Sequence, residues 1–268
     1  MGELDEDALD ALFDADAEAA GQLLVDLVGA ADPVLRARAR RLAGRLALRT
    51  ARGTVARARG VGTVVSRVGA EGDLDLDASI ERAGGRPRDP AELVARTWAA
   101  PDQALMLCID RSGSMRGVQV LVAATAAAAV LLAAEGRSRA GVLAFGTDAL
   151  VLRAPGSPRP VDAVVDDVLS LRGHGVTDVA LGLTTASEEL AADHRASRVA
   201  VVLSDCLATS GADPITVLGG FDRVHVLGTS DDAASVAAGR RLARAGGGRH
   251  RVVTGLGQLA PALTRLLS

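Results

Sequence analysis

The sequence contains no lysine, no asparagine and no tyrosine, and it has only three phenylalanines and one tryptophan in 268 residues. The lack of lysine excludes a P-loop nucleotide site and a Schiff-base enzyme, and the lack of asparagine excludes N-glycosylation. The scarcity of aromatic rings leaves few platforms on which nucleic-acid bases could stack. Hydrophobic residues still make up 49% of the chain, so we expect a large core packed from alanine, valine and leucine.

The charge pattern gives little reason to expect a nucleic-acid or membrane partner. The net charge is −3, which provides no overall basic surface for nucleic acid or anionic lipid. The first twenty residues are acidic where a signal peptide would be basic, and no apolar run reaches the roughly 18 to 20 residues that span a bilayer. We therefore expect a cytoplasmic protein without a membrane span.

Two cysteines, Cys108 and Cys206, lie in apolar runs typical of strands. This setting favours buried thiols in a reducing compartment over a disulfide framework. A redox role is the alternative if the two strands are neighbours.

The amino-terminal charges are segregated. Residues 1–32 contain ten acidic side chains and no basic one, whereas residues 33–60 contain nine arginines and no acid. The spacing predicts an acidic and a basic helix, the latter with Arg38, Arg41, Arg45, Arg49 and Arg52 on one face. We interpret residues 1–60 as a charged helical extension whose helices face each other or the solvent. A docking arm for a charged partner is the sharper alternative, and the acidic helix would oppose nucleic-acid binding by the arginines.

Residues 61–103 are predicted to form an α/β connecting segment that packs on or near the following domain. Val61–Val68 has β-branched strand character, and Asp73, Asp75 and Asp77 alternate with leucine. The aspartates do not form a calcium loop of the EF-hand kind, because the required glycine and glutamate are missing.

From residue 104 to 268 short apolar runs alternate with amphipathic stretches. This order predicts a doubly wound, mainly parallel sheet with helices on both faces. The expected strands are Ala104–Ile109, Ala140–Phe145, Ala149–Leu152, Val199–Leu203, Arg223–Leu227 and Arg251–Val253. The expected helices are Val118–Glu135, Val161–Leu171, Asp178–Ala192, Pro214–Gly219, Asp232–Ala245 and Leu256–Leu267.

Oxygen-bearing side chains follow the strands of this sheet. Asp110, Ser112 and Ser114 come directly after the first strand, Thr177 precedes a helix, and Asp205 follows the most apolar strand. Ligands of such sheets bind beyond the carboxyl ends of the strands, so these loops are expected to meet. Hydroxyls with one or two carboxylates suit a hard cation such as Mg²⁺.

These three segments resemble the metal-ion-dependent adhesion site of von Willebrand factor A-type domains. The pattern Asp-x-Ser-x-Ser matches Asp110, Ser112 and Ser114, while Thr177 and Asp205 match the family's second and third motifs. The resemblance implies a Mg²⁺ site, with Mn²⁺ and Ca²⁺ as alternatives, in which the hydroxyls bind the metal and the aspartates act largely through water. It also implies that an acidic side chain of a partner protein completes the metal shell. The sequence departs from the family in having Gly-Val-Thr at residues 175–177, with His174 nearby.

The preceding segment is similar to bacterial CoxE-like proteins, which are encoded beside MoxR-type AAA+ ATPases. The similarity rests on residues 72–75 (Gly-Asp-Leu-Asp) and 94–98 (Val-Ala-Arg-Thr-Trp). It implies an adaptor or co-chaperone whose partner is the ATPase or its client.

The chain is expected not to be an enzyme, and the alternative is a metal-assisted hydrolase that uses the same site. The only candidate acid–base groups near the motifs are His174, Asp178 and Asp148, and no motif supports them. Ser112 stands where a haloacid-dehalogenase phosphatase needs its second aspartate, and neither a nucleophile elbow nor a dinucleotide fingerprint is present. An extracellular adhesion protein would share the metal site, but it would be expected to carry a signal peptide and disulfides.

Overall fold

A computed structural model of the chain describes residues 6–28, 33–58, 63–68, 73–99, 103–113, 115, 117–135, 139–173, 175–192 and 197–267. The chain divides into two compact units. One unit joins residues 1–58 to residues 102–267, and the other consists of residues 59–101.

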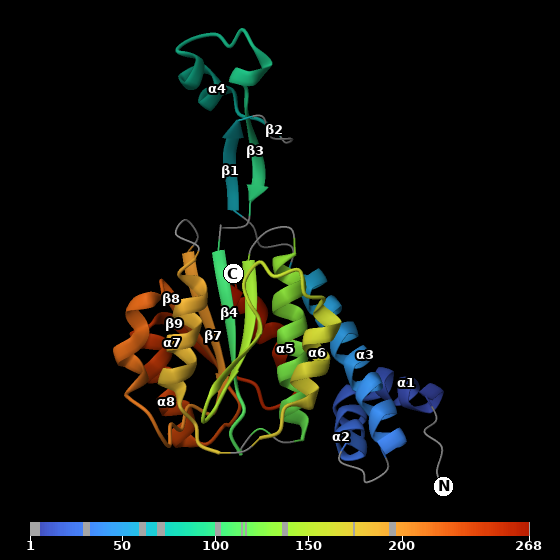
Figure 1. Cartoon of the computed structure of the whole chain (residues 1–268). Helices are drawn as coiled ribbons and strands as arrows, with labels where there is room; N and C mark the ends of the chain where they lie inside the picture. Colours follow the sequence, from blue (N-terminus) through green and yellow to red (C-terminus); the bar gives the residue numbers. More distant parts are fainter. Residues whose placement is uncertain are drawn as a thin grey trace. The chain divides into compact units, whose positions relative to one another are not determined.

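The larger unit is built on a six-stranded sheet with the order β6-β5-β4-β7-β8-β9 (Figure 1). Every pair of neighbouring strands is parallel except β5 and β6, which are antiparallel. The predicted doubly wound α/β fold is therefore confirmed. The strands are β4 (Gln103–Asp110), β5 (Arg139–Phe145), β6 (Ala149–Arg153), β7 (Ser197–Ser204), β8 (Arg223–Gly228) and β9 (Gly247–Val252).

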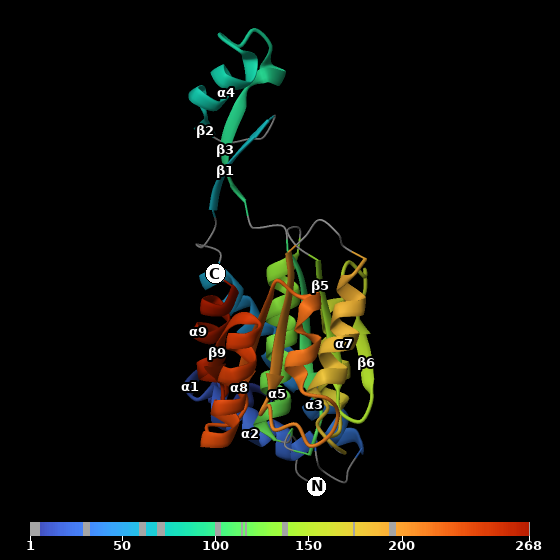
Figure 2. The same cartoon turned by 90° about the vertical axis from the view of Figure 1, so that its left-hand side faces the viewer.

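Helices cover both faces of this sheet, as the two turned views show (Figures 1 and 2). Successive side chains of a strand point to opposite faces, and in β4 Leu105 and Leu107 join one core while Met106 and Cys108 join the other. The first core contains α5 (Val118–Ala134), α6 (Val161–Ser170) and α9 (Leu256–Leu267). The second contains α7 (Val179–Leu190), the 3-10 helix η2 (Pro214–Gly220) and α8 (Ala233–Ala245).

In the described residues 6–28 and 33–58, the amino-terminal region forms three helices rather than two. They are α1 (Glu6–Ala15), α2 (Ala17–Val28) and α3 (Pro33–Ala58). Asp16 separates the first two, because its side chain accepts hydrogen bonds from the backbone N–H groups of Glu18 and Ala19 and so caps α2.

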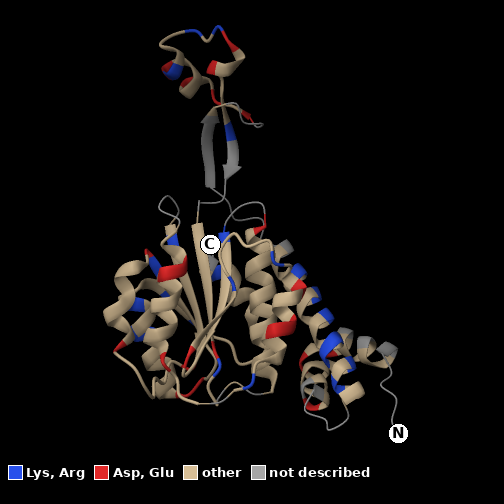
Figure 3. Ribbon diagram, in the orientation of Figure 1, with Lys and Arg blue, Asp and Glu red and all other residues tan. Residues whose placement is uncertain are grey.

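Helix α3 packs against α5 and α6 as part of the main core. Its buried side includes Ala39, Ala43, Ala47 and Ala51, about one residue per helical turn, together with Leu42 and Leu46. The five arginines predicted to share a helical face are all exposed, and Figure 3 shows basic residues along the length of α3. Arg49 lies over the ring of Phe13 in α1, with 5.1 Å between the guanidinium carbon and the ring centre.

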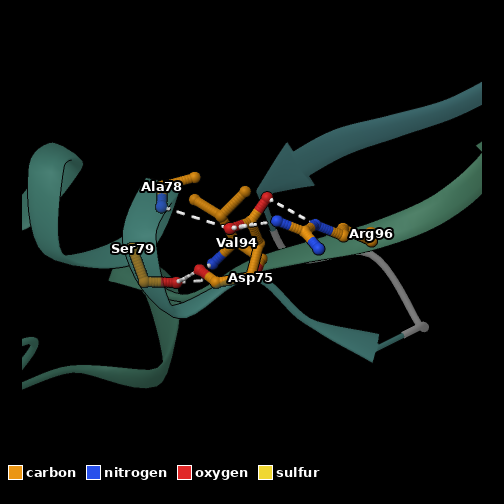
Figure 4. A network of polar contacts seen from close by, with 5 residues as sticks. All are labelled: Asp75, Ala78, Ser79, Val94 and Arg96. Carbon is orange, nitrogen blue, oxygen red and sulfur yellow. Dashed lines mark hydrogen bonds and ion pairs between the residues drawn. The ribbon is translucent and has the colours of Figure 1, made fainter.

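The smaller unit is a three-stranded antiparallel sheet with the order β1-β3-β2. Its elements are β1 (Thr63–Val68), β2 (Asp73–Leu74), α4 (Leu76–Ala83), the 3-10 helix η1 (Pro90–Glu92) and β3 (Val94–Ala99). Asp75 caps α4 by accepting a hydrogen bond from the Ala78 N–H, and it pairs with Arg96 at 3.0 Å (Figure 4). The Ser79 hydroxyl accepts a hydrogen bond from the N–H of Val94 at 2.9 Å and so joins α4 to β3. The second of the alternating aspartates is thus a helix cap.

Cys108 lies in β4 and Cys206 lies two residues beyond the end of β7, and the two are not bonded. Cys108 is in register with Val202, four residues before Cys206, and both thiols are free and buried. Burial raises the pKa of the Cys206 thiol to about 12 and that of Cys108 still higher. Both are therefore protonated at neutral pH, as expected for inert core residues.

No helix in the part of the chain that the structure describes is both long and apolar enough to cross a membrane.

Candidate metal-binding site

Asp110 ends β4, and the sheet register places it beside the end of β7. The parallel pairing sets Ile109 against Leu203, so the next residues, Asp110 and Ser204, end the two neighbouring strands at the same edge of the sheet. The Ser204 hydroxyl donates to Asp110 Oδ2 at 2.6 Å, and the Ser112 N–H donates to Oδ1 at 2.8 Å. Asp110 is only 1% exposed, and its carboxylate is fixed in position by one donor from the end of β7 and one from the loop after β4.

The first loop of the site follows β4 and turns tightly. The second loop, between α6 and α7, contacts it. Ser112 is buried, and its carbonyl accepts the N–H of Met115 at 3.0 Å. A Cβ atom on Gly173 would lie 2.6 Å from the carbonyl oxygens of both residues. The second loop can approach this closely only because residue 173 has no side chain. Ser114 and His174 lie outside the described residues.

Thr177, in the second loop, is buried and held by the third. Its N–H donates to Thr209 Oγ1 at 2.9 Å, and its carbonyl accepts the N–H groups of Thr209 and Ser210 at 3.0 and 3.3 Å. Position 177 is therefore fixed at its backbone, which leaves its hydroxyl as the group available to a ligand.

The third loop leaves β7 through Asp205, which is half-buried. Asp205 Oδ1 accepts the N–H of Leu207 at 3.0 Å, and its carbonyl accepts the hydroxyl of Ser235 in α8 at 2.6 Å. The next residue, Cys206, has a φ of 58°, and its N–H donates to Ser204 Oγ at 2.9 Å. A non-glycine residue in this left-handed region is uncommon, and such outliers cluster at functional sites.

The site carries excess negative charge. Burial raises the pKa of Asp110, the nearby Asp205 adds to this, and the hydrogen bonds from Ser204 and Ser112 oppose it. Neither aspartate has an ion pair with any residue that the structure describes. Arg111, which follows Asp110, pairs instead with Asp148. Two close carboxylates without a basic partner among the described residues fit a bound divalent cation, which would offset their repulsion.

The donor set also suits a hard ion. Among the described residues no three side chains of the His, Cys, Asp or Glu type gather as a metal cluster, so a site here would need hydroxyl groups as well as the two carboxylates. The carboxylates and hydroxyls of Asp110, Asp205, Ser112 and Thr177 are the oxygen ligands that Mg²⁺ prefers.

Of the predicted residues, the structure describes Asp110, Ser112, Thr177 and Asp205, and it places them at one edge of the sheet. The contacts that hold them there were not predicted from the sequence. The Ser204 hydroxyl bonds Asp110 to the end of β7, and Thr209 holds the backbone of Thr177. The Ser235 hydroxyl bonds the carbonyl of Asp205, and Gly173 lets the second loop approach the first. Ser204 could have been recognised, because it directly precedes Asp205 at a strand end.

Residues 105–208 match the family described as the von Willebrand factor type A domain. The chain contains a von Willebrand factor type A (VWA) domain. All five predicted metal-binding residues, Ser114 included, lie inside the matched segment. The helices α1 to α3 and α8 to α9 lie outside it.

Solved structures share the fold of the VWA domain at low sequence identity. The PilB minor pilin from Streptococcus sanguinis is 16% identical, with a TM-score of 0.51 over 65% of this chain and 63% of that one. The SpaC pilus adhesin from Lactobacillus rhamnosus is 14% identical, with a TM-score of 0.50 over 62% of this chain and 30% of that one. An aerotolerance-related membrane protein from Bacteroides fragilis is 17% identical, with a TM-score of 0.48 over 62% and 98% of the two chains. A search of curated proteins finds no match.

Proposed function

We propose that the VWA domain is a Mg²⁺-dependent protein-binding module in which a carboxylate of a partner protein completes the metal site. The observation that carries this proposal is that the carboxylates of Asp110 and Asp205 lie close together among hydroxyl groups. Neither aspartate has a described basic partner. Ser112, Ser114 and Thr177 would hold the ion, and the two aspartates would supply charge and orient bound water. When bound, the ion supplies a Lewis-acidic position that accepts a carboxylate oxygen.

The chain's own residues support a site prepared for binding. Donors from the loop after β4 and from the end of β7 fix the Asp110 carboxylate, and the backbone of Thr177 makes three hydrogen bonds to the third loop. Such positioned ligands lose little conformational freedom when a partner binds, which improves affinity.

The neighbouring acid–base candidates favour binding over hydrolysis. Asp148 pairs with Arg111, and the Asp178 carboxylate caps α7 by accepting the N–H of Leu181 at 2.8 Å. A Cβ atom on Gly211 would lie 2.2 Å from the same carboxylate, so the third loop covers Asp178 closely. Both aspartates are engaged in these contacts, which argues against either of them as a general base.

A MoxR-type AAA+ ATPase or its client is the partner we propose. This part rests on the likeness of residues 72–75 and 94–98 to CoxE-like proteins. Residues 73–74 and 94–98 contribute to β2 and β3 of the smaller unit.

The test is retention of partners from a lysate of the source organism by the tagged full chain in Mg²⁺ and in EDTA. We expect a protein that is retained by wild type in Mg²⁺ and lost both in EDTA and with Asp110→Asn. Glu188→Gln, an exposed acid on α7, is the matched control and should retain it. Retention that ignores both EDTA and Asp110→Asn contradicts the proposal, and a retained protein that is not an ATPase or its client removes the MoxR part alone.

A further inference from the structure

A cleft of about 350 Å³ opens beside the third loop of the metal site. Residues of α7, of η2, of α8 and of the loop after β7 line it. Its walls are mainly apolar, and Arg241 and Asp213 form an ion pair at 2.5 Å among the lining residues. The apolar lining consists chiefly of Val179, Leu207, Pro214, Ile215, Ala238 and Leu242.

The cleft and the metal site share one loop. Residues 206–209 line the cleft and directly follow Asp205. Within this loop Thr209 clamps the backbone of Thr177, so one wall of the cleft holds a predicted metal ligand. On the other side Ser235, which binds the carbonyl of Asp205, lies one helical turn before Ala238 in α8. A group that enters the cleft therefore contacts Thr209, which holds Thr177, and lies against the helix whose Ser235 holds Asp205.

Exposed apolar side chains surround the metal loops. Leu207 is 41% exposed at the cleft, and Val176, next to Thr177, is 37% exposed. Large apolar residues that flank a polar site in this way are typical of protein-interaction surfaces, where a buried apolar anchor lies beside polar contacts. An extended peptide advances about 3.3 Å per residue, so a side chain one to three residues from a metal-bound carboxylate could reach the adjoining cleft.

We infer that this cleft holds an aliphatic side chain of the same partner segment whose carboxylate binds at the metal. The occupant is a protein segment with one acidic residue and a leucine, isoleucine or valine within three positions of it. The inference rests on the proposed function for the carboxylate. The metal alone would accept any accessible acidic residue, so the cleft is the part of the site that selects among acidic segments.

The test uses synthetic heptapeptides of glycine and serine with a central glutamate. Six further peptides carry one leucine at one, two or three positions before or after the glutamate. Binding to the full chain in Mg²⁺ is measured by NMR of leucine, valine and isoleucine methyl groups. We expect leucine in at least one register to strengthen binding about tenfold or more, the gain typical of burying an aliphatic side chain, and to shift the methyl signals of Ile215 and Leu242.

Two alanines of α8 provide a matched pair of variants. Ala238→Leu fills the cleft from within and should remove the leucine gain while leaving the glutamate-only peptide unchanged. Ala237→Leu adds the same side chain at the preceding, exposed position, which does not line the cleft, and should keep the gain.

The inference is overturned if leucine gives no gain in any register, or if the two alanine variants behave alike. Leucine peptides that bind equally well in Mg²⁺ and EDTA would uphold the cleft and contradict the metal-dependent function. Glutamate binding that needs Mg²⁺ but gains nothing from leucine would uphold the function and overturn the cleft. The two failures are therefore distinguishable.

Discussion

The hydroxyl of Ser204 lies 2.6 Å from Asp110 Oδ2 and donates a hydrogen bond to it, although 94 residues separate the two in sequence. The hydroxyl oxygen of Ser204 also accepts a hydrogen bond from the N–H of Cys206 at 2.9 Å. One serine therefore links the first metal loop to the third. The register of two central strands therefore brings these two loops of the candidate metal site together.

Replacing Ser204 with alanine removes this link. We expect Ser204→Ala to lower the free energy of unfolding by about 1–3 kcal/mol, because it leaves a buried carboxylate oxygen and a buried N–H without their partner. The affinity for Mg²⁺ should fall about 10- to 100-fold, the usual effect of losing a group that orients a ligand. Urea unfolding and calorimetric metal titration measure the two effects. Ser170→Ala, at an exposed position in α6, should change neither.

Gly173 tests the contact between the first and second loops. Gly173→Ala would place a Cβ atom 2.6 Å from two backbone carbonyl oxygens, so the loops must separate. We expect a stability loss of about 1–3 kcal/mol and weaker Mg²⁺ binding. Gly113→Ala is the control in the same region, because its Cβ would meet no atom within 4 Å. Equal effects of the two variants would show that the close approach at Gly173 does not matter.

Ala47 tests whether α3 belongs to the folded domain. Ala47 is fully buried in the core that α3 shares with α5, so Ala47→Leu must displace neighbouring side chains. We expect a loss of about 1–3 kcal/mol in a single cooperative urea transition. Ala37→Leu, on the exposed side of the same helix, should be nearly neutral. A neutral Ala47→Leu would mean that α3 is only loosely attached.

His225 makes the stability depend on pH. Burial lowers its pKa to about 4, with the nearby Arg223 and Arg249 adding to the effect, and its Nδ1 accepts the N–H of Arg249 at 3.1 Å. The unfolded chain takes up this proton near pH 6.5 but the folded chain only near pH 4, so stability is lost as the pH falls through this window. His225→Asn keeps an acceptor and removes the titration. Between pH 7 and pH 5 we expect wild type to lose about 2 kcal/mol more than the variant in urea unfolding. Equal losses of unfolding free energy in wild type and His225→Asn would contradict the assigned pKa.

The alternation of strands and helices was sufficient to predict the sheet and the edge at which the metal loops meet. A continuous apolar strand such as β7 indicates a sheet that is covered on both faces, as parallel sheets are. Parallel neighbouring strands bring their carboxyl ends to the same edge of the sheet. Asp110 and Asp205 were therefore predictable as neighbours. The link through Ser204 was not, because it depends on the residue-by-residue register of β4 against β7.

Two other features were obscured by local composition. The dense arginines of α3 predict a solvated helix and hide the alanines that attach it to α5, since alanine gives a weak hydrophobic signal. Strand β9 begins at Gly247, four residues before the predicted start at Arg251, because glycine has low strand propensity. Glycine is nevertheless needed at position 248, where a Cβ atom would lie 2.0 Å from the carbonyl oxygen of Val224.

Titration of Mg²⁺ into the full chain by isothermal calorimetry tests the central claim most directly. The account predicts one ion per chain for wild type and no binding by Asp110→Asn in the same concentration range, with both proteins folded by circular dichroism. Wild type that binds no Mg²⁺ at millimolar concentration, or Asp110→Asn that binds it equally well, would contradict the account.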